Sequence, residues 1–183
     1  IPGVDYAVRD ARVMKQYLIR TLGFDEKRIF EYYDGDALQS KLRSRFNTQL
    51  KNSVTPGKSD VFIYYSGHGV PDTDTKEAYF APYDFDSETI ADTGYALKDF
   101  YSQIEKYGAK STTVVIDACF SGSSERGMII KSASPVFLKV STPTFGARNG
   151  VVFTSSSGEQ ISSWYHEKKH GLFTYYFLSG LQG

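Results

Sequence analysis

Apolar residues recur along the chain with two spacings, one typical of helices and one of strands. Helical spacing is clearest in residues 5–22, after which Gly23 gives a stop signal. The apolar face of this predicted helix consists of Val8, Ala11, Met14, Tyr17, Leu18 and Leu22. The same spacing predicts further helices over residues 34–52, 96–108 and 170–181.

Strands are predicted where β-branched and aromatic residues gather without helical spacing. These runs are residues 28–33, 61–69, 111–119 and 151–157. Two of them, 61–69 and 111–119, are apolar without alternation, which is typical of strands buried on both faces of a parallel sheet. Because strands and helices alternate, the pattern predicts an α/β fold with a mostly parallel sheet. Residues 121–150 show little periodicity and predict a long exposed loop.

The amino-acid composition indicates the class of protein but not any reaction it catalyses. The chain has 183 residues, enough to bury one core, and its 21 basic residues balance 21 acidic ones. We therefore expect neither a nucleic-acid nor a membrane partner. The single cysteine excludes an internal disulfide and favours a reducing, cytoplasmic location. The first residues show neither an initiator Met nor a signal pattern, so we expect additional domains in the full-length protein.

Both predicted buried strands end in a polar corner that contains glycine, SGHG at 66–69 and DACFSG at 117–122. Ligand sites in open α/β sheets lie at such carboxyl ends. We predict that Cys119 is a nucleophile and that His68 takes up and returns its proton. The backbone N–H groups of Gly69 and Cys119 would then form an oxyanion hole. For either side chain alone, an inert buried cysteine or a separately satisfied histidine is the alternative.

Two stretches raise the question of a metal. HEKKH (166–170) matches a zinc-binding pattern that requires a helix, but Gly171 follows directly and the helical pattern starts only there. We therefore predict a turn, with a zinc hydrolase as the rival interpretation. The acidic residues of 70–95 lack the spacing of an EF-hand and are interpreted as a solvated loop. They are Asp72, Asp74, Asp84, Asp86, Glu88 and Asp92.

YYSGHG together with VVIDACFSG resembles the His and Cys motifs of caspase-like cysteine peptidases, within them the metacaspases, paracaspases and their prokaryotic relatives. As in caspases, the histidine precedes the cysteine by about 50 residues. The stretches AVRDARVMKQYLIRTLGF, APYDFD, FTSSSGEQIS and HGLFTYYFLSGL are similar to further parts of that family.

This resemblance implies a three-layer α/β/α sandwich, here as one peptidase domain over residues 1–183. It also implies a monomer that requires no cofactor, with calcium activation left open. The family's first, central strand precedes the first helix, and nothing in the chain supplies it, so we expect an N-terminal truncation.

Asp117 raises a question of its own, because a nearby carboxylate favours a thiol over a thiolate and so does not activate Cys119. Recognition of a substrate cation explains it better. Metacaspases have Asp at this position and cleave after Arg or Lys, whereas true caspases have Gln and choose acidic residues. The resemblance adds Asp10 and Glu159 to the same pocket. Several carboxylates suit a bidentate guanidinium, so we expect Arg to be preferred over Lys.

The segment between Cys119 and Val151 contains no aspartate, although it contains Arg126, Lys131, Lys139 and Arg148. An enzyme of this type that matures by cutting itself here can do so only with basic specificity. We therefore predict a zymogen of a cysteine endopeptidase that acts on polypeptides at Arg or Lys. The alternative is a catalytically silent caspase-like interaction module.

Overall fold

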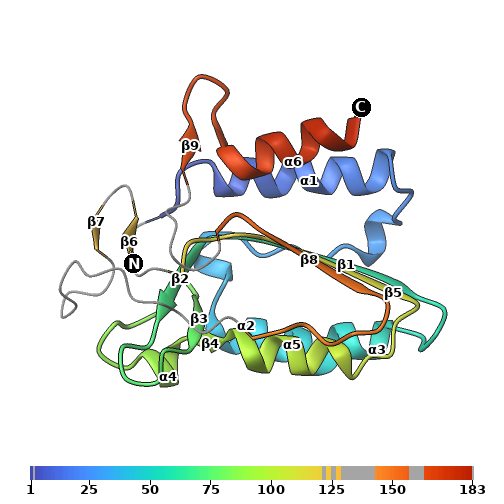
Figure 1. The fold of residues 1–183 in the computed structure, drawn as a ribbon. Helices are drawn as coiled ribbons and strands as arrows, with labels where there is room; N and C mark the ends of the chain where they lie inside the picture. Colours follow the sequence, from blue (N-terminus) through green and yellow to red (C-terminus); the bar gives the residue numbers. More distant parts are fainter. Residues whose placement is uncertain (2, 121–122, 125–126, 129–142, 157–162, 183) are drawn as a thin grey trace.

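A parallel sheet of three strands forms the middle layer of the protein (Figure 1). The structure is a computed structural model that describes residues 1, 3–120, 123–124, 127–128, 143–156 and 163–182. The sheet has the order β1 (Asp60–Ser66), β5 (Ser111–Asp117) and β8 (Gly150–Thr154). Because Ser66 is paired with Asp117, β1 and β5 end side by side.

Helices cover both faces of this sheet. Figure 1 shows α1 (Ala7–Arg20) and α6 (Leu172–Gln182) on one face and α2 (Gln39–Ser44), α3 (Lys51–Ser53) and α5 (Leu97–Glu105) on the other. The predicted three-layer α/β/α sandwich with a mostly parallel sheet is therefore confirmed. No helix in the described part of the chain combines the length and the apolar character that crossing a bilayer requires.

Smaller sheets accompany the parallel sheet. One is an antiparallel sheet of β2 (His68–Pro71), β3 (Ala78–Ala81) and β4 (Tyr95–Ala96), and its first strand follows β1 after Gly67. Two short antiparallel pairs join β6 (Ser123–Ser124) to β7 (Gly127–Met128) and β9 (Trp164–Tyr165) to β10 (His170–Gly171). The remaining short helices are η1 (Glu26–Arg28), η2 (Asp34–Asp36), η3 (Arg45–Leu50) and α4 (Ile90–Thr93), of which η3 is a π-helix.

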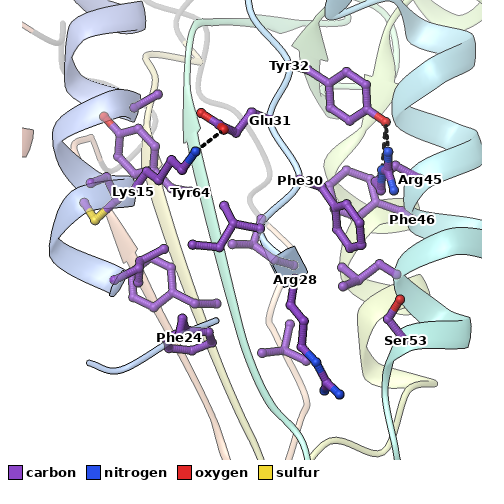
Figure 2. Close-up of a pocket in the computed structure, with 18 of the residues that line it drawn as sticks. Lys15, Phe24, Arg28, Phe30, Glu31, Tyr32, Arg45, Phe46, Ser53 and Tyr64 are labelled. Carbon is purple, nitrogen blue, oxygen red and sulfur yellow. Dashed lines mark hydrogen bonds and ion pairs between the residues drawn. The ribbon is translucent and has the colours of Figure 1, made fainter. Parts of the chain in front are cut away.

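The predicted strand at residues 28–33 is wrong. After η1 the backbone is extended but joins no described strand, and its side chains are held from neighbouring helices instead. Glu31 pairs with Lys15 of α1 at 2.6 Å, and the hydroxyl of Tyr32 accepts from Nε of Arg45 at 2.7 Å. A cavity of about 260 Å³ separates this segment from β1 (Figure 2). A strand needs a hydrogen-bonding neighbour, and here it faces a cavity.

The same cavity bears on the expected absence of the family's first strand. Among the described residues, β1 pairs only with β5, so its other edge has no strand beside it. The cavity runs along this edge, lined by residues 59–64 on one side and by α1 on another. Ala11, Met14 and Lys15 are among the residues of α1 that line this cavity.

Several predicted boundaries shift by a few residues. The predicted strand 61–69 divides at Gly67 into β1 and β2, and the predicted strand 111–119 ends at Asp117. The predicted helix 34–52 begins only at Gln39 and passes through α2, η3 and α3. Cys119 therefore lies just beyond β5 and not on the strand, where the predicted range 111–119 placed it.

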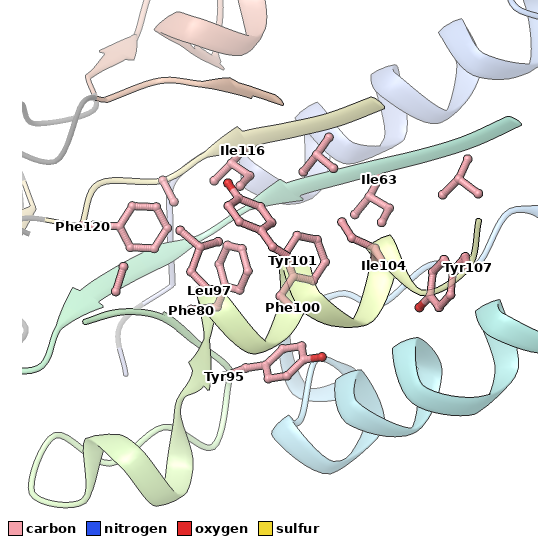
Figure 3. Packing of buried hydrophobic residues seen from close by; sticks show 14 residues of the cluster. Ile63, Phe80, Tyr95, Leu97, Phe100, Tyr101, Ile104, Tyr107, Ile116 and Phe120 are labelled. Carbon is pink, nitrogen blue, oxygen red and sulfur yellow. The ribbon is translucent and has the colours of Figure 1, made fainter. Parts of the chain in front are cut away.

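The main core lies between the sheet and α5 (Figure 3). Phe100 and Ile104 of α5 are fully buried against Val114 and Ile116 of β5. Phe80 of β3 meets the ring of Phe100 edge to face at 5.3 Å between centroids, an arrangement that aromatic pairs prefer. Burying each such side chain contributes about 1.5–3 kcal/mol, so this cluster holds α5 against β1 and β5.

The buried stripe of α1 differs from the predicted apolar face in one respect. The residues that α1 buries are Asp10, Met14 and Leu18, one turn apart from each other. Leu22 lies beyond the end of the helix and is 48% exposed. A carboxylate therefore occupies a core position, on the face of α1 that lies over the carboxyl ends of the strands.

Candidate active site

The structure brings the two motifs that contain His68 and Cys119 together at the carboxyl ends of β1 and β5. The N–H of Gly67 donates to the carbonyl of Asp117 at 3.2 Å, which joins the two corners directly. His68 is half-buried at the start of β2, and its carbonyl accepts from the hydroxyl of Tyr65 at 2.8 Å. Cys119 is 9% exposed and free of any disulfide. The predicted nucleophile and acid/base group thus lie in adjoining corners.

Gly69 packs tightly against the corner that contains the cysteine. A Cβ at this position would come within 2.8 Å of the carbonyl oxygen of Cys119 and within 2.5 Å of the ring of Phe120. Real Cβ atoms do not approach so closely, so a glycine is required for the two corners to meet. The backbone of Gly69 consequently lies against that of Cys119, as an oxyanion hole shared by their N–H groups would need.

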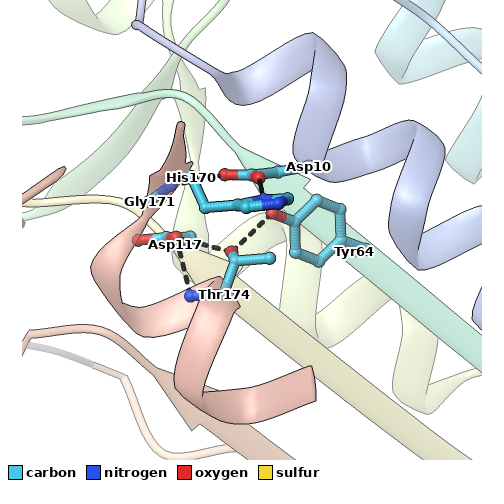
Figure 4. A network of polar contacts seen from close by, with 6 residues as sticks. All are labelled: Asp10, Tyr64, Asp117, His170, Gly171 and Thr174. Carbon is cyan, nitrogen blue, oxygen red and sulfur yellow. Dashed lines mark hydrogen bonds and ion pairs between the residues drawn. The ribbon is translucent and has the colours of Figure 1, made fainter. Parts of the chain in front are cut away.

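Asp117 is buried at the end of β5 and binds the beginning of α6 (Figure 4). Its Oδ2 accepts from the hydroxyl of Thr174 at 2.6 Å and from the N–H of Thr174 at 3.3 Å. That N–H belongs to the first turn of α6, where backbone donors have no partner within the helix. Since the Thr174 hydroxyl gives its proton to Asp117, the 2.7 Å contact with Tyr64 is donated by the tyrosine. Asp117 therefore also caps a helix.

Asp10 reaches the same place from α1. Its Oδ1 contacts Nδ1 of His170, and its Oδ2 accepts from the N–H of Gly171 at 2.7 Å. Both partners belong to β10, which leads directly into α6. Asp10 and Asp117 thus hold successive residues of one segment, which joins α1, β5 and α6 at one point.

Gly171 lies between the two carboxylates. A Cβ there would come within 2.6 Å of Oδ2 of Asp117 and 3.1 Å of Oδ2 of Asp10. Burial raises the pKa of Asp117, although hydrogen bonds from Thr174 and Ser155 oppose the rise. Burial likewise raises the pKa of Asp10; the N–H of Gly171 and His170 oppose this, whereas the charge of Asp117 adds to it. Two acidic groups are therefore concentrated in one water-poor site.

Sequence reasoning missed His170, Thr174 and Tyr64 as members of this network. His170 was considered only as part of HEKKH, and no spacing rule connects it with Asp10, which lies at the other end of the chain. A usable signal was the sequence His170–Gly171 directly before an apolar helix. A titratable side chain and a glycine at a helix start indicate a close approach of backbone to a neighbouring element.

The first four residues of HEKKH, 166–169, form the turn of the β9–β10 hairpin, as predicted, and His170 begins β10. The zinc pattern depends on two histidines one helical turn apart, and this hairpin does not provide that arrangement. The ring of His166 instead packs against Trp164 and lies 3.2 Å from the hydroxyl of Tyr6, while His170 is engaged with Asp10. The described residues contain no group of three or more His, Cys, Asp or Glu side chains placed to hold a metal.

Two of the acidic residues of 70–95 cap local turns, and a third binds the start of a helix. Asp72 accepts from the N–H groups of Asp74 and Thr75, and Asp86 from that of Glu88. Asp84 accepts from the N–H of Gln39 at the start of α2.

The remaining predicted site residues lie elsewhere. Arg148 is exposed in the turn before β8. The pocket residue Glu159 and the predicted cleavage sites Arg126, Lys131 and Lys139 lie outside the described residues, as does most of the predicted loop 121–150.

Comparison with known proteins places the chain in a family. A family model described as the caspase domain matches residues 3–183, and comparison with curated protein sequences finds no match. The matched region contains both corners of the site and both buried carboxylates. The chain therefore belongs to the caspase-domain family of cysteine peptidases.

Proposed function

We propose that this protein is a cysteine endopeptidase of the metacaspase type that hydrolyses peptide bonds after Arg and, less readily, after Lys. Cys119 attacks the scissile carbonyl carbon, and His68 accepts the thiol proton and returns it to the leaving amine. The N–H groups of Gly69 and Cys119 bind the oxyanion of the tetrahedral intermediate. Water then hydrolyses the resulting thioester and regenerates the thiol.

The observation that carries this proposal is the pair of buried carboxylates beside the nucleophile. Asp117 precedes Cys119 by two residues, and Gly171 contacts Asp117 and Asp10 at once. Burial raises the pKa of both carboxyl groups, so a cation that binds both stabilises their charged forms. A guanidinium offers five donors in a planar fork, which suits two carboxylates better than the point charge of an ammonium. Glu159 is proposed as a further acidic group of this pocket.

Self-cleavage in the segment after Cys119 follows from the same specificity. Its candidate sites are Arg126, Lys131, Lys139 and Arg148. Arg148 is exposed in a turn, where a second copy of the enzyme can reach it. Cleavage there would make this protein a zymogen that is processed at basic residues.

The test is hydrolysis of fluorogenic peptides ending in Arg, Lys, Asp or Leu, with calcium and with a chelator. We expect cleavage after Arg, weaker cleavage after Lys and none after Asp. Cys119→Ala should lower the rate by at least about three orders of magnitude, because the nucleophile acts as a unit with its base. Ser102→Ala, on the exposed side of α5, is the matched control and should retain wild-type activity.

The outcomes separate the competing interpretations. Cleavage after Asp but not Arg would contradict the proposed specificity. A folded wild-type protein that cuts none of the peptides in either condition would favour the interaction module instead. Activity that survives in Cys119→Ala would contradict the assignment of the nucleophile.

A further inference from the structure

His170 occupies an unusual position in the candidate pocket. Its Nδ1 contacts Oδ1 of Asp10, so a basic side chain of the protein already engages the carboxylate proposed to bind a basic substrate. The side chain of His170 is 13% exposed and that of Asp10 only 1% exposed. Of the two partners, it is therefore the histidine that reaches solvent. Figure 4 shows the two side chains beside each other.

The side chains that contact His170 in the described part of the structure are acidic or neutral, and the adjacent Lys169 is exposed in the preceding turn. Asp10 faces it from α1, and Asp117 of β5 lies on the other side of Gly171. The ring of Tyr175 of α6 lies 6.1 Å away, and Tyr165 is its partner in β9. Tyr64 of β1 completes the network in Figure 4. Imidazole ordinarily changes its charge between pH 5 and 8, whereas a guanidinium stays charged.

We propose that His170 is the built-in counter-cation of the basic-residue pocket, which an incoming guanidinium displaces with loss of the proton on the imidazole. A protonated imidazole in this position balances the charge of Asp10. When an arginine side chain arrives, two cations compete for one carboxylate pair, and only the imidazole can give up its charge. This inference rests on the proposed function, because it assumes that Asp10 and Asp117 receive the substrate cation.

A consequence for specificity follows from linkage. Binding that releases a proton becomes tighter as pH rises through the range in which the imidazole titrates. Affinity for a charged arginine side chain should therefore rise by up to about tenfold per pH unit in that range. A neutral side chain of the same shape displaces no charge and should show no such dependence. His170 thus makes the pocket more selective for arginine in neutral than in acidic conditions.

The test is titration calorimetry of wild-type protein with acetyl-arginine amide at pH 5.5, 6.5 and 7.5, with acetyl-citrulline amide as the neutral probe. Measurements in buffers of different ionisation enthalpy count the protons released. We expect up to one proton released per arginine probe bound and affinity that increases with pH. In His170→Gln we expect almost no release and affinity that changes less than about twofold over the range. His170→Lys, which keeps a cation at every pH, should bind the arginine probe weakly even at pH 7.5.

His166→Gln is the matched control. It removes a histidine from the same hairpin turn, one that contacts Tyr6 and Trp164, and it should release protons like the wild type. Wild-type binding without proton release would overturn the inference while leaving the pocket intact. Equal release in His170→Gln would do the same, because the proton would then come from the carboxylates. No binding of the arginine probe to wild type would overturn the proposed pocket itself, and the inference with it.

Discussion

Gly171 shows how closely the site constrains a single residue. Its backbone passes between Asp10 and Asp117 and donates to the first of them at 2.7 Å. Any side chain there would displace at least one carboxylate, since the nearest oxygen would lie 2.6 Å from the new Cβ. The glycine is therefore needed for space and not for an unusual backbone angle.

We expect Gly171→Ala to lower the stability of the protein by about 1–3 kcal/mol, the usual cost of overpacking a filled site. Activity toward arginine peptides should fall with it, because the carboxylates must move apart. Urea unfolding and kcat/KM measure the two effects. Gly180→Ala is the control, since nothing lies within 4 Å of a Cβ there and α6 should gain about 0.5–1 kcal/mol. A Gly171→Ala protein as stable as wild type would contradict the described packing.

His68 and Cys119 could be predicted from their corners because the signal is local, a nucleophile and a base at the ends of two buried strands. His170 could not, because its partner Asp10 is held against it only by the packing of α1 on α6. Asp117 was predicted as a recognition residue, and its second task as the cap of α6 depends on Thr174, which no spacing rule connects with it.

At the scale of elements, α6 is attached to the sheet through a charged group. Asp117 of β5 accepts from the N–H and the hydroxyl of Thr174 in the first turn of α6. A carboxylate is favourable at a helix N-terminus, yet burial raises the pKa of Asp117 above its ordinary value. The native state therefore binds a proton here more readily than the unfolded state does. The stability that this group contributes is full at low pH and is lost as pH rises through the native pKa.

Asp117→Asn should accordingly be more stable than wild type at pH 8, with a difference that shrinks toward pH 4. The amide oxygen still accepts from Thr174, and the cost of burying a charge disappears. Urea midpoints at pH 4, 6 and 8 measure the effect. Asp60→Asn is a control of opposite sign, because a hydrogen bond from Ser111 lowers the pKa of that exposed carboxyl. An Asp117→Asn protein less stable than wild type at pH 8 would contradict this account of Asp117.

For the whole molecule, the alternation of periodic segments was sufficient to predict the α/β class and the mostly parallel sheet, whereas the two layers of helices were implied by the resemblance to caspase-like peptidases. The prediction of a strand at residues 28–33 is wrong because no strand among the described residues lies beside this segment to pair with it. Between this segment and β1 lies the cavity of about 260 Å³. Periodicity reports what a segment prefers to bury, whereas sheet pairing also needs a neighbour at the right edge.

The same long-range assembly produces the site. Residues from the first helix, two strands and the last helix meet at one point, so the candidate pocket exists only when α1 and α6 pack together on the sheet. The central claim is that this assembled pocket recognises positive charge through Asp10 and Asp117.

The most direct measurement compares kcat/KM for two peptides that differ only in arginine or its neutral isostere citrulline at the cleavage position, with wild type and Asp117→Asn. We predict that wild type prefers arginine by at least about a hundredfold, the scale of a buried charge pair left without its partner. Asp117→Asn should lose most of that preference while its citrulline rate stays within about threefold of the wild-type rate. Equal cleavage of both peptides by wild type, or an unchanged preference in Asp117→Asn, would contradict the claim.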